Sequence, residues 1–262
     1  MNKTYTFDDF INIIRVLRSE NGCPWDREQT HESLKNCLIE EAYEVIEAIN
    51  NKDNENLCEE LGDILLQVAL HTIIAEESKE FFLSDVINGI STKMIRRHPH
   101  VFGNKEQTGV TNIDSGTVLK NWEEIKSEEK KESKASEGIL SIPKALPSTI
   151  RAEKVQKKAA RVGLDFKDFN EALDKVYEEL KELKEAKENQ DKEDIEEEFG
   201  DLMFSVVNLS RFLQLNAENS LTNATNKFIN RFVRIERLAE QEGKQLNELS
   251  VGELDALWGR VK

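Results

Sequence analysis

The sequence predicts an all-α protein built from two tandem helical-bundle domains. Only 4 of its 262 residues are proline and 12 are glycine, whereas Glu, Lys, Leu, Ala and Ile, which favour helices, are common. Apolar residues recur at helical spacing along most of the chain, and we find no convincing run of alternating β-branched residues. A set of acidic residues also returns at the same spacing in the second half, which indicates a duplicated fold.

The first half is expected to contain a series of amphipathic helices. Thr6 is placed to cap the first helix, and the segment NGCPWDREQT interrupts the helical pattern after it. Ser84 is expected to cap a later helix that stops before Pro99, and the loop HPHVFGNKEQTG follows. After the first helix, the expected helices cover approximately residues 30–50, 54–78, 84–98 and 115–131.

The segment SKASEGILSIPKALPS, with Pro143 and Pro147, is interpreted as a linker between the halves. We therefore predict an N-terminal domain over residues 1–132, a linker over 133–147 and a C-terminal domain over 148–262. Asp168, Ser220 and Ser250 are expected N-caps. The expected helices of this half cover approximately residues 148–161, 169–189, 192–214, 220–242 and 251–262.

Five carboxylates form the repeated set. Each acid of the second half lies 138 residues after its counterpart, without a gap. Clustered acids repel one another and resist burial unless a cation lies between them. The first set is Glu40, Glu41, Glu44, Glu60 and Asp63, and the second is Glu178, Glu179, Glu182, Glu198 and Asp201.

Each set is expected to meet within an antiparallel helical hairpin. Acids three residues apart share a helix face, and residues equidistant from the hairpin turn lie at the same height. Glu44 and Asp63 are equidistant from the polar turn NNKDNEN, and Glu182 and Asp201 from ENQDKED. Hard oxygen ligands suit Mg²⁺ or Mn²⁺. Solvated helix faces are the alternative for any single Glu, but they do not explain five matched positions.

Cationic and aromatic residues also repeat after each hairpin. Lys93 and Arg97 are four residues apart, as are Lys227 and Arg231, and Trp122 and Trp258 follow in W-E-E-I-K and W-G-R-V-K. Lysine and arginine one helical turn apart can hold phosphate oxygens, and tryptophan can stack on a base. Together with the acids, this order predicts a site for a nucleotide polyphosphate.

Charge and cysteine content restrict the class of protein. The formal net charge of −15 argues against broad binding to nucleic acid or to anionic membranes. Cys23, Cys37 and Cys58 form no C-x-x-C pair, and neither an apolar signal core nor a spanning segment is evident, so we expect a cytoplasmic protein with reduced thiols. The chain has no G-x-x-x-x-G-K-[ST] motif of a P-loop enzyme.

Glu-Glu-x-x-Glu followed by Glu-x-x-Asp resembles the signature of the all-α nucleoside triphosphate pyrophosphohydrolases, and the tandem arrangement is similar to the MazG family. NGCPWDREQT, RRHPHVFG, NWEEIKSEE, KVYEELKE and EEEFGDL resemble MazG segments, in order and over nearly the whole chain. The resemblance implies Mg²⁺-dependent hydrolysis of nucleoside triphosphates, ATP among them, to the monophosphate and pyrophosphate, by a homodimer of helical bundles. It implies metal ligands at Glu179, Glu182, Glu198 and Asp201, and nucleotide contacts at Lys175, Lys227, Arg231 and Trp258.

Glu178 has two candidate roles, because it either orients a ligand or acts as the base for the attacking water. The two copies also differ, because Lys175 corresponds to Cys37, and only a lysine can meet a phosphate there. We therefore expect the C-terminal copy to be the main catalyst, with Glu41, Glu44, Glu60 and Asp63 forming a second metal site that is a weaker enzyme, a regulatory site or a relic. The rival hypothesis is a nucleotide-sensing or partner-binding scaffold with little or no turnover.

Overall fold

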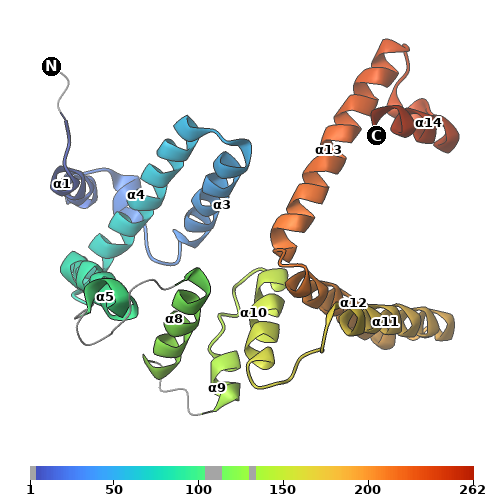
Figure 1. The fold of residues 1–262 in the computed structure, drawn as a ribbon. Helices are drawn as coiled ribbons and strands as arrows, with labels where there is room; N and C mark the ends of the chain where they lie inside the picture. Colours follow the sequence, from blue (N-terminus) through green and yellow to red (C-terminus); the bar gives the residue numbers. More distant parts are fainter. Residues whose placement is uncertain (1–3, 104–113, 130–133) are drawn as a thin grey trace. The chain divides into compact units, whose positions relative to one another are not determined.

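A computed structural model describes residues 4–103, 114–129 and 134–262, and these residues form helices and no strand. The all-α prediction is therefore confirmed. The chain divides into two compact units, residues 1–126 and 127–262 (Figure 1). None of the helices in the described part of the chain is long and apolar enough to span a membrane.

The first unit is organised around a long helical hairpin. α3 and α4 pack against each other, and α4 also packs against α1 and α5. The buried core lies between α1, the start of α3 and the second half of α4, and contains Ile11, Ile14, Leu34, Ala69, Leu70 and Ile73. The helices are α1 (Phe7–Arg18), α2 (Pro24–Glu28), α3 (Lys35–Asn51), α4 (Asn54–Ser78), α5 (Leu83–Arg97), α6 (Pro99–Phe102) and α8 (Ser115–Glu129).

The second unit contains a matching hairpin, α11 with α12, and a second helix pair, α13 with α14. α10 packs against both α12 and α13. Ile235, Ala239, Leu257 and Val261 form the buried cluster between α13 and α14. The elements are α9 (Ala135–Leu140), α10 (Ser148–Ala160), α11 (Phe169–Asn189), α12 (Lys192–Phe212), α13 (Ala217–Gln241), the short 3₁₀ helix η1 (Leu246–Glu248) and α14 (Val251–Val261).

The turns of the two hairpins have the same construction. Lys52 and Gln190, 138 residues apart, end α3 and α11 in the left-handed conformation, with φ of 56° and 61°. The next residue caps the following helix in both cases. The Asp53 carboxylate accepts from the amides of Glu55 and Asn56, and Asp191 does the same at the start of α12. An aspartate cap satisfies amides that have no partner inside the helix, so the repeated sequence produces a repeated turn.

Four local predictions need correction. Residues 99–102 of the predicted loop HPHVFGNKEQTG form the short helix α6. Residues 30–34 form a turn, in which the Thr30 and Ser33 side chains accept from each other's backbone amides, and α3 begins only at Lys35. Ser84 is not a cap, because α5 begins at Leu83 and the Asp85 carboxylate accepts from the Phe82 amide. Ser220 lies inside α13, whose N-cap is Asn216. The predicted caps Thr6, Asp168 and Ser250 are confirmed.

The segment between the halves is more ordered than a linker. Residues 135–140 of the predicted linker form α9, which packs against α10. The predicted boundary at 132/133 and the last two residues of the helix expected to end at 131 lie outside the described residues. The domain limits as a whole stay a prediction.

Candidate functional site

The first unit brings three of its acids together. Carboxylate oxygens of Glu41 on α3 and of Glu60 and Asp63 on α4 lie within 4.8 Å of one another, and all three residues are half-buried. Glu44 is exposed, but its charge contributes, after desolvation, to raising the pKa of Glu60. Desolvation and then the charge of Asp63 raise the pKa of Glu41. Burial and the neighbouring acids therefore disfavour the ionised forms of Glu41 and Glu60, and a cation between the carboxylates would relieve the repulsion.

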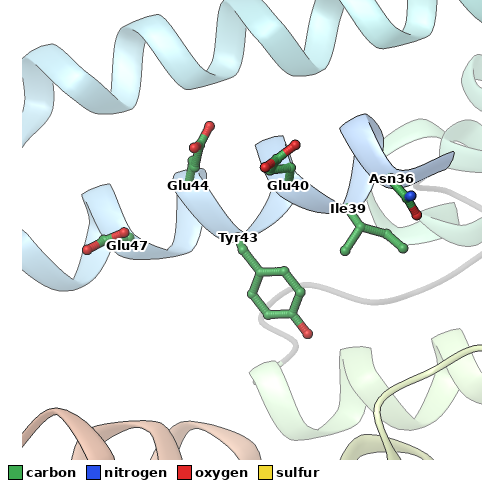
Figure 2. Close-up of a pocket in the computed structure, with 6 residues that line it drawn as sticks. All are labelled: Asn36, Ile39, Glu40, Tyr43, Glu44 and Glu47. Atoms are coloured by element: carbon green, nitrogen blue, oxygen red, sulfur yellow. The ribbon is translucent and has the colours of Figure 1, made fainter. Parts of the chain in front are cut away.

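Glu40, Tyr43 and Glu44 project from neighbouring positions of α3, with the two carboxylates pointing in one direction and the Tyr43 ring in another (Figure 2). Together with Asn36, Ile39 and Glu47, these residues line a shallow pocket of about 400 Å³ on α3. Tyr43 is 49% exposed, and Ile39 is 55% exposed. This acidic hairpin therefore presents apolar as well as charged surface.

The second unit forms the corresponding cluster with a different membership. Carboxylate oxygens of Glu179 and Glu182 on α11 and of Glu198 on α12 lie within 4.8 Å of one another. Glu179 is buried, with 4% of its surface exposed. Desolvation, followed by the charges of Glu182, Glu179 and Asp201, raises the pKa of Glu198. Asp201 itself is exposed, one turn farther along α12.

Lys175 distinguishes the second cluster from the first. Its Nζ lies 2.7 Å from Glu179 and 2.8 Å from Glu178, one turn along α11. These hydrogen bonds, first to Glu178 and then to Glu179, raise the pKa of Lys175. The matching position on α3 is Cys37, which is half-buried and unpaired. The two copies thus differ in ion pairing, because Glu179 is paired with Lys175, whereas the position that corresponds to this lysine in the first copy is a cysteine.

The cationic and aromatic residues pair with one another in each unit. The Arg97 guanidinium lies 5.2 Å from the Trp122 ring centroid, and the Arg231 guanidinium lies 5.8 Å from that of Trp258. Lys227 is exposed on α13. In the second unit these residues belong to α13 and α14, whereas the acids belong to α11 and α12. The structure therefore joins the predicted site residues into two groups on two helix pairs.

Two features were missed from the sequence. Phe228 packs against Trp258, with ring centroids 5.2 Å apart, in a groove between α13 and α14. The signal for it was the spacing of Phe228 and Phe232, each directly after a cation of the Lys227/Arg231 pair. In the first unit, His31 and His71 stack with their Nδ1 atoms 2.8 Å apart. Their separation of 40 residues gave no local signal.

Comparison with known proteins agrees with the duplicated fold. The family model described as "MazG nucleotide pyrophosphohydrolase domain" matches residues 29–102 and residues 168–234. The chain belongs to the MazG family. Both matched segments of this MazG chain contain an acidic hairpin and the Lys/Arg pair that follows it, so the tandem arrangement is confirmed.

Three relatives match nearly the whole length of this chain. The chain is 48% identical over 256 residues to "Nucleoside triphosphate pyrophosphohydrolase/pyrophosphatase MazG" of Thermotoga maritima, covering 98% of this chain and 95% of the relative. It is 40% identical over 258 residues to "Nucleoside triphosphate pyrophosphohydrolase" of Escherichia coli K12, covering 97% and 96%. It is also 47% identical over 259 residues to "Uncharacterized protein YabN" of Bacillus subtilis. This match covers 98% of this chain and 52% of the relative.

Proposed function

We propose that this chain hydrolyses nucleoside triphosphates to the monophosphate and pyrophosphate, that the reaction needs Mg²⁺, and that it occurs mainly at the C-terminal acid cluster. The observation that carries the proposal is the set of three carboxylates within 4.8 Å beside a lysine that is 2.7 Å from the buried Glu179. The names of the relatives from Thermotoga maritima and Escherichia coli support the reaction type.

The donor set fits a small divalent cation. Carboxylate oxygens are the ligands that Mg²⁺ prefers, and Mn²⁺ accepts the same set. Desolvation and then neighbouring negative charge raise the pKa of Glu198, and such a cation would neutralise that charge. The residues proposed to hold it are Glu179, Glu182, Glu198 and Asp201, and in the N-terminal copy Glu41, Glu44, Glu60 and Asp63.

A bound Mg²⁺ would stabilise negative charge on the phosphate oxygens as water attacks the α-phosphorus. The bond from this phosphorus to the bridging oxygen then breaks, and pyrophosphate leaves. Lys175, which lies between the carboxylates of Glu178 and Glu179, is proposed to contact a phosphate oxygen. Glu178 either orients a ligand or takes the proton of the attacking water.

The C-terminal preference rests on burial and on charge. Glu179 is buried and paired with Lys175, whereas Glu41 is half-buried and Cys37 occupies the lysine position. A phosphate approaching the first cluster would therefore meet acids without that cation. The N-terminal copy is proposed to be the weaker or regulatory site.

Lys227, Arg231 and Trp258 are proposed to contact the nucleotide, and a homodimer is proposed to bring their helix pair to an acid cluster. The acidic hairpin of the second unit leaves large apolar side chains exposed, as a surface that packs on another copy would. They are Tyr177, Leu180, Phe199, Met203, Phe204 and Val206, each at least 43% exposed. The free thiols Cys23, Cys37 and Cys58 suit the proposed cytoplasmic location.

The test is product analysis. The protein is incubated with Mg²⁺ and each common nucleoside triphosphate, and monophosphate and pyrophosphate are measured. Glu179→Ala should lower kcat/KM by about 100-fold or more, because a metal ligand supplies several kcal/mol of charge stabilisation in the transition state. Glu41→Ala is the matched variant in the other copy and should retain most activity. Equal losses would refute the C-terminal assignment, and nucleotide binding without turnover would favour the scaffold hypothesis.

A further inference from the structure

The groove beside Trp258 has the dimensions and lining of a nucleobase site. It lies between α13, η1 and α14 and encloses about 490 Å³, within the range of small-ligand pockets. Most of its lining is apolar, and Phe228, Phe232 and Trp258 supply aromatic rings. Phe228 is 56% exposed and Phe232 is 47% exposed, so these rings offer free apolar surface.

The rings are arranged so that they could hold a flat heterocycle. Phe228 and Phe232 stack at 6.5 Å with 22° between their planes, and Phe228 lies 5.2 Å from Trp258. A base packed on such rings gains affinity whichever base it is, because every base has a π-face. Arg231, which lies against Trp258, belongs to the pair proposed to contact the phosphates. Stacking alone would therefore bind nucleotides without discriminating between them.

Discrimination would come from the two polar residues that line the groove, Asn247 and Asp255. Within the described residues, Asp255 is exposed and forms no ion pair. A carboxylate accepts hydrogen bonds, and an amide both accepts and donates. Guanine matches this set, since its ring N1–H and its exocyclic amine donate side by side while its O6 and N7 accept. Uracil places carbonyl oxygens on both sides of its single N–H, and these would repel a carboxylate.

The first unit provides an internal comparison. There, Arg97 also lies against a tryptophan, but His98 occupies the position that corresponds to Phe232 and packs edge-on against Trp122 at 4.9 Å. The sequence position three before Trp122 is a leucine, whereas the position three before Trp258 is Asp255. The first unit therefore keeps the cation and the tryptophan without the carboxylate.

We propose that Asp255 and Asn247 favour guanine over uracil in the groove beside Trp258, so that the C-terminal site prefers guanine to uracil nucleoside triphosphates. This inference rests on the proposed function. Asp255 accepts from the N1–H and the amine of the base, Asn247 donates to O6 or N7, and the rings of Phe228, Phe232 and Trp258 hold the base plane.

The first experiment measures kcat/KM for GTP, ATP, CTP and UTP. The wild type should prefer GTP to UTP by tenfold or more, the discrimination of one bidentate base contact. Asp255→Ala should lose most of this preference through the GTP value. Asp255→Asn should also narrow the preference for GTP, but by raising kcat/KM for UTP, because an amide can donate to a uracil carbonyl. Glu240→Ala removes an exposed acid of α13 that does not line the groove, and its preference should match the wild type.

The second experiment measures binding without turnover. In a Trp25→Phe/Trp122→Phe background, quenching of Trp258 fluorescence is titrated with GMP and with UMP. GMP should bind about tenfold more tightly, and Asp255→Ala should remove the difference. Equal binding of GMP and UMP to the parent, or an unchanged difference in Asp255→Ala, would overturn the assignment. Absence of pyrophosphate release from every triphosphate would refute the proposed function, while this titration would still test the groove.

Discussion

The ion pair between Lys175 and Glu179 yields a prediction that separates its structural role from that of the metal. Glu179 retains 6% of its side-chain exposure and Lys175 retains 33%. Removing one partner of a fully buried pair costs 3–5 kcal/mol, and an exposed pair contributes only about 0–1 kcal/mol. Because this pair lies between the two limits, Lys175→Met should lower the free energy of unfolding by about 1–3 kcal/mol in EDTA.

The loss should be smaller in saturating MgCl₂. A cation held by the acid cluster would neutralise Glu179 in the variant as well, so the missing lysine would leave less uncompensated charge. We expect the loss to fall below about 1 kcal/mol, the value of an exposed pair. The Glu178 and Glu179 hydrogen bonds raise the pKa of Lys175, so the lysine contribution is fully present at neutral pH and is lost only as pH rises above the ordinary lysine range.

Urea denaturation at neutral pH, in EDTA and in MgCl₂, measures both values. Cys37→Met is the matched control, because it changes the corresponding position in the first copy without removing an ion pair. This control should shift stability equally in the two solutions. If Lys175→Met lost the same free energy with and without Mg²⁺, the idea that the lysine and the cation compensate the same carboxylate would be wrong.

Three further changes test the fold. Leu70 is 2% exposed in the first core, so Leu70→Ala should cost about 2–5 kcal/mol in urea denaturation; a loss near zero would show that this core is not packed as described. Burial and then the charge of His31 lower the pKa of His71. Because the unfolded chain therefore binds a proton at a higher pH than the folded chain does, the free energy of unfolding should fall as pH drops below about 6.5. His71→Leu introduces the residue found at the corresponding position of the second unit, Leu209. Between neutral and mildly acidic pH, its urea midpoint should fall less than that of the wild type, and an equal fall in the two proteins would exclude His71 as the cause. Asp191→Ala removes the cap of α12 and should cost about 1 kcal/mol, whereas Asp191→Asn should retain most of that stability.

The acidic hairpins could be predicted from the sequence because two local signals agree in them. The acids recur at helical spacing, and each turn contains a polar segment with an aspartate that caps the next helix. Helix geometry then brings the two acidic edges of each hairpin together without knowledge of distant contacts. The exact partners differ from the equidistant pairs, because the first cluster contains Asp63 without Glu44 and the second contains Glu182 without Asp201. The duplication supplied an independent check, since the turn residues repeat at the same interval as the acids.

Helix starts were less predictable, because several side chains nearby can satisfy the first amides. Thr30 and Ser33 bond each other's backbone and hold a turn where apolar periodicity alone predicts helix. At α13, Asn216 caps the helix four residues before Ser220, a residue with equal capping chemistry. The choice between such candidates depends on where the preceding chain is anchored, and that is set by tertiary packing.

The arrangement of the cationic and aromatic residues depends on tertiary structure in a stronger sense. Because these residues follow each acidic hairpin in the sequence, they can be associated with the acids. Their order in the sequence does not predict which helix pair they belong to. In the second unit, Arg231 and Trp258 pair on α13 and α14, while Lys175 is the cation in direct contact with the cluster on α11. A triphosphate that used all of these residues would need contacts from both helix pairs. The homodimer proposed above would cover the exposed apolar side chains of the acidic hairpin, and it is proposed to supply the second helix pair to the acids.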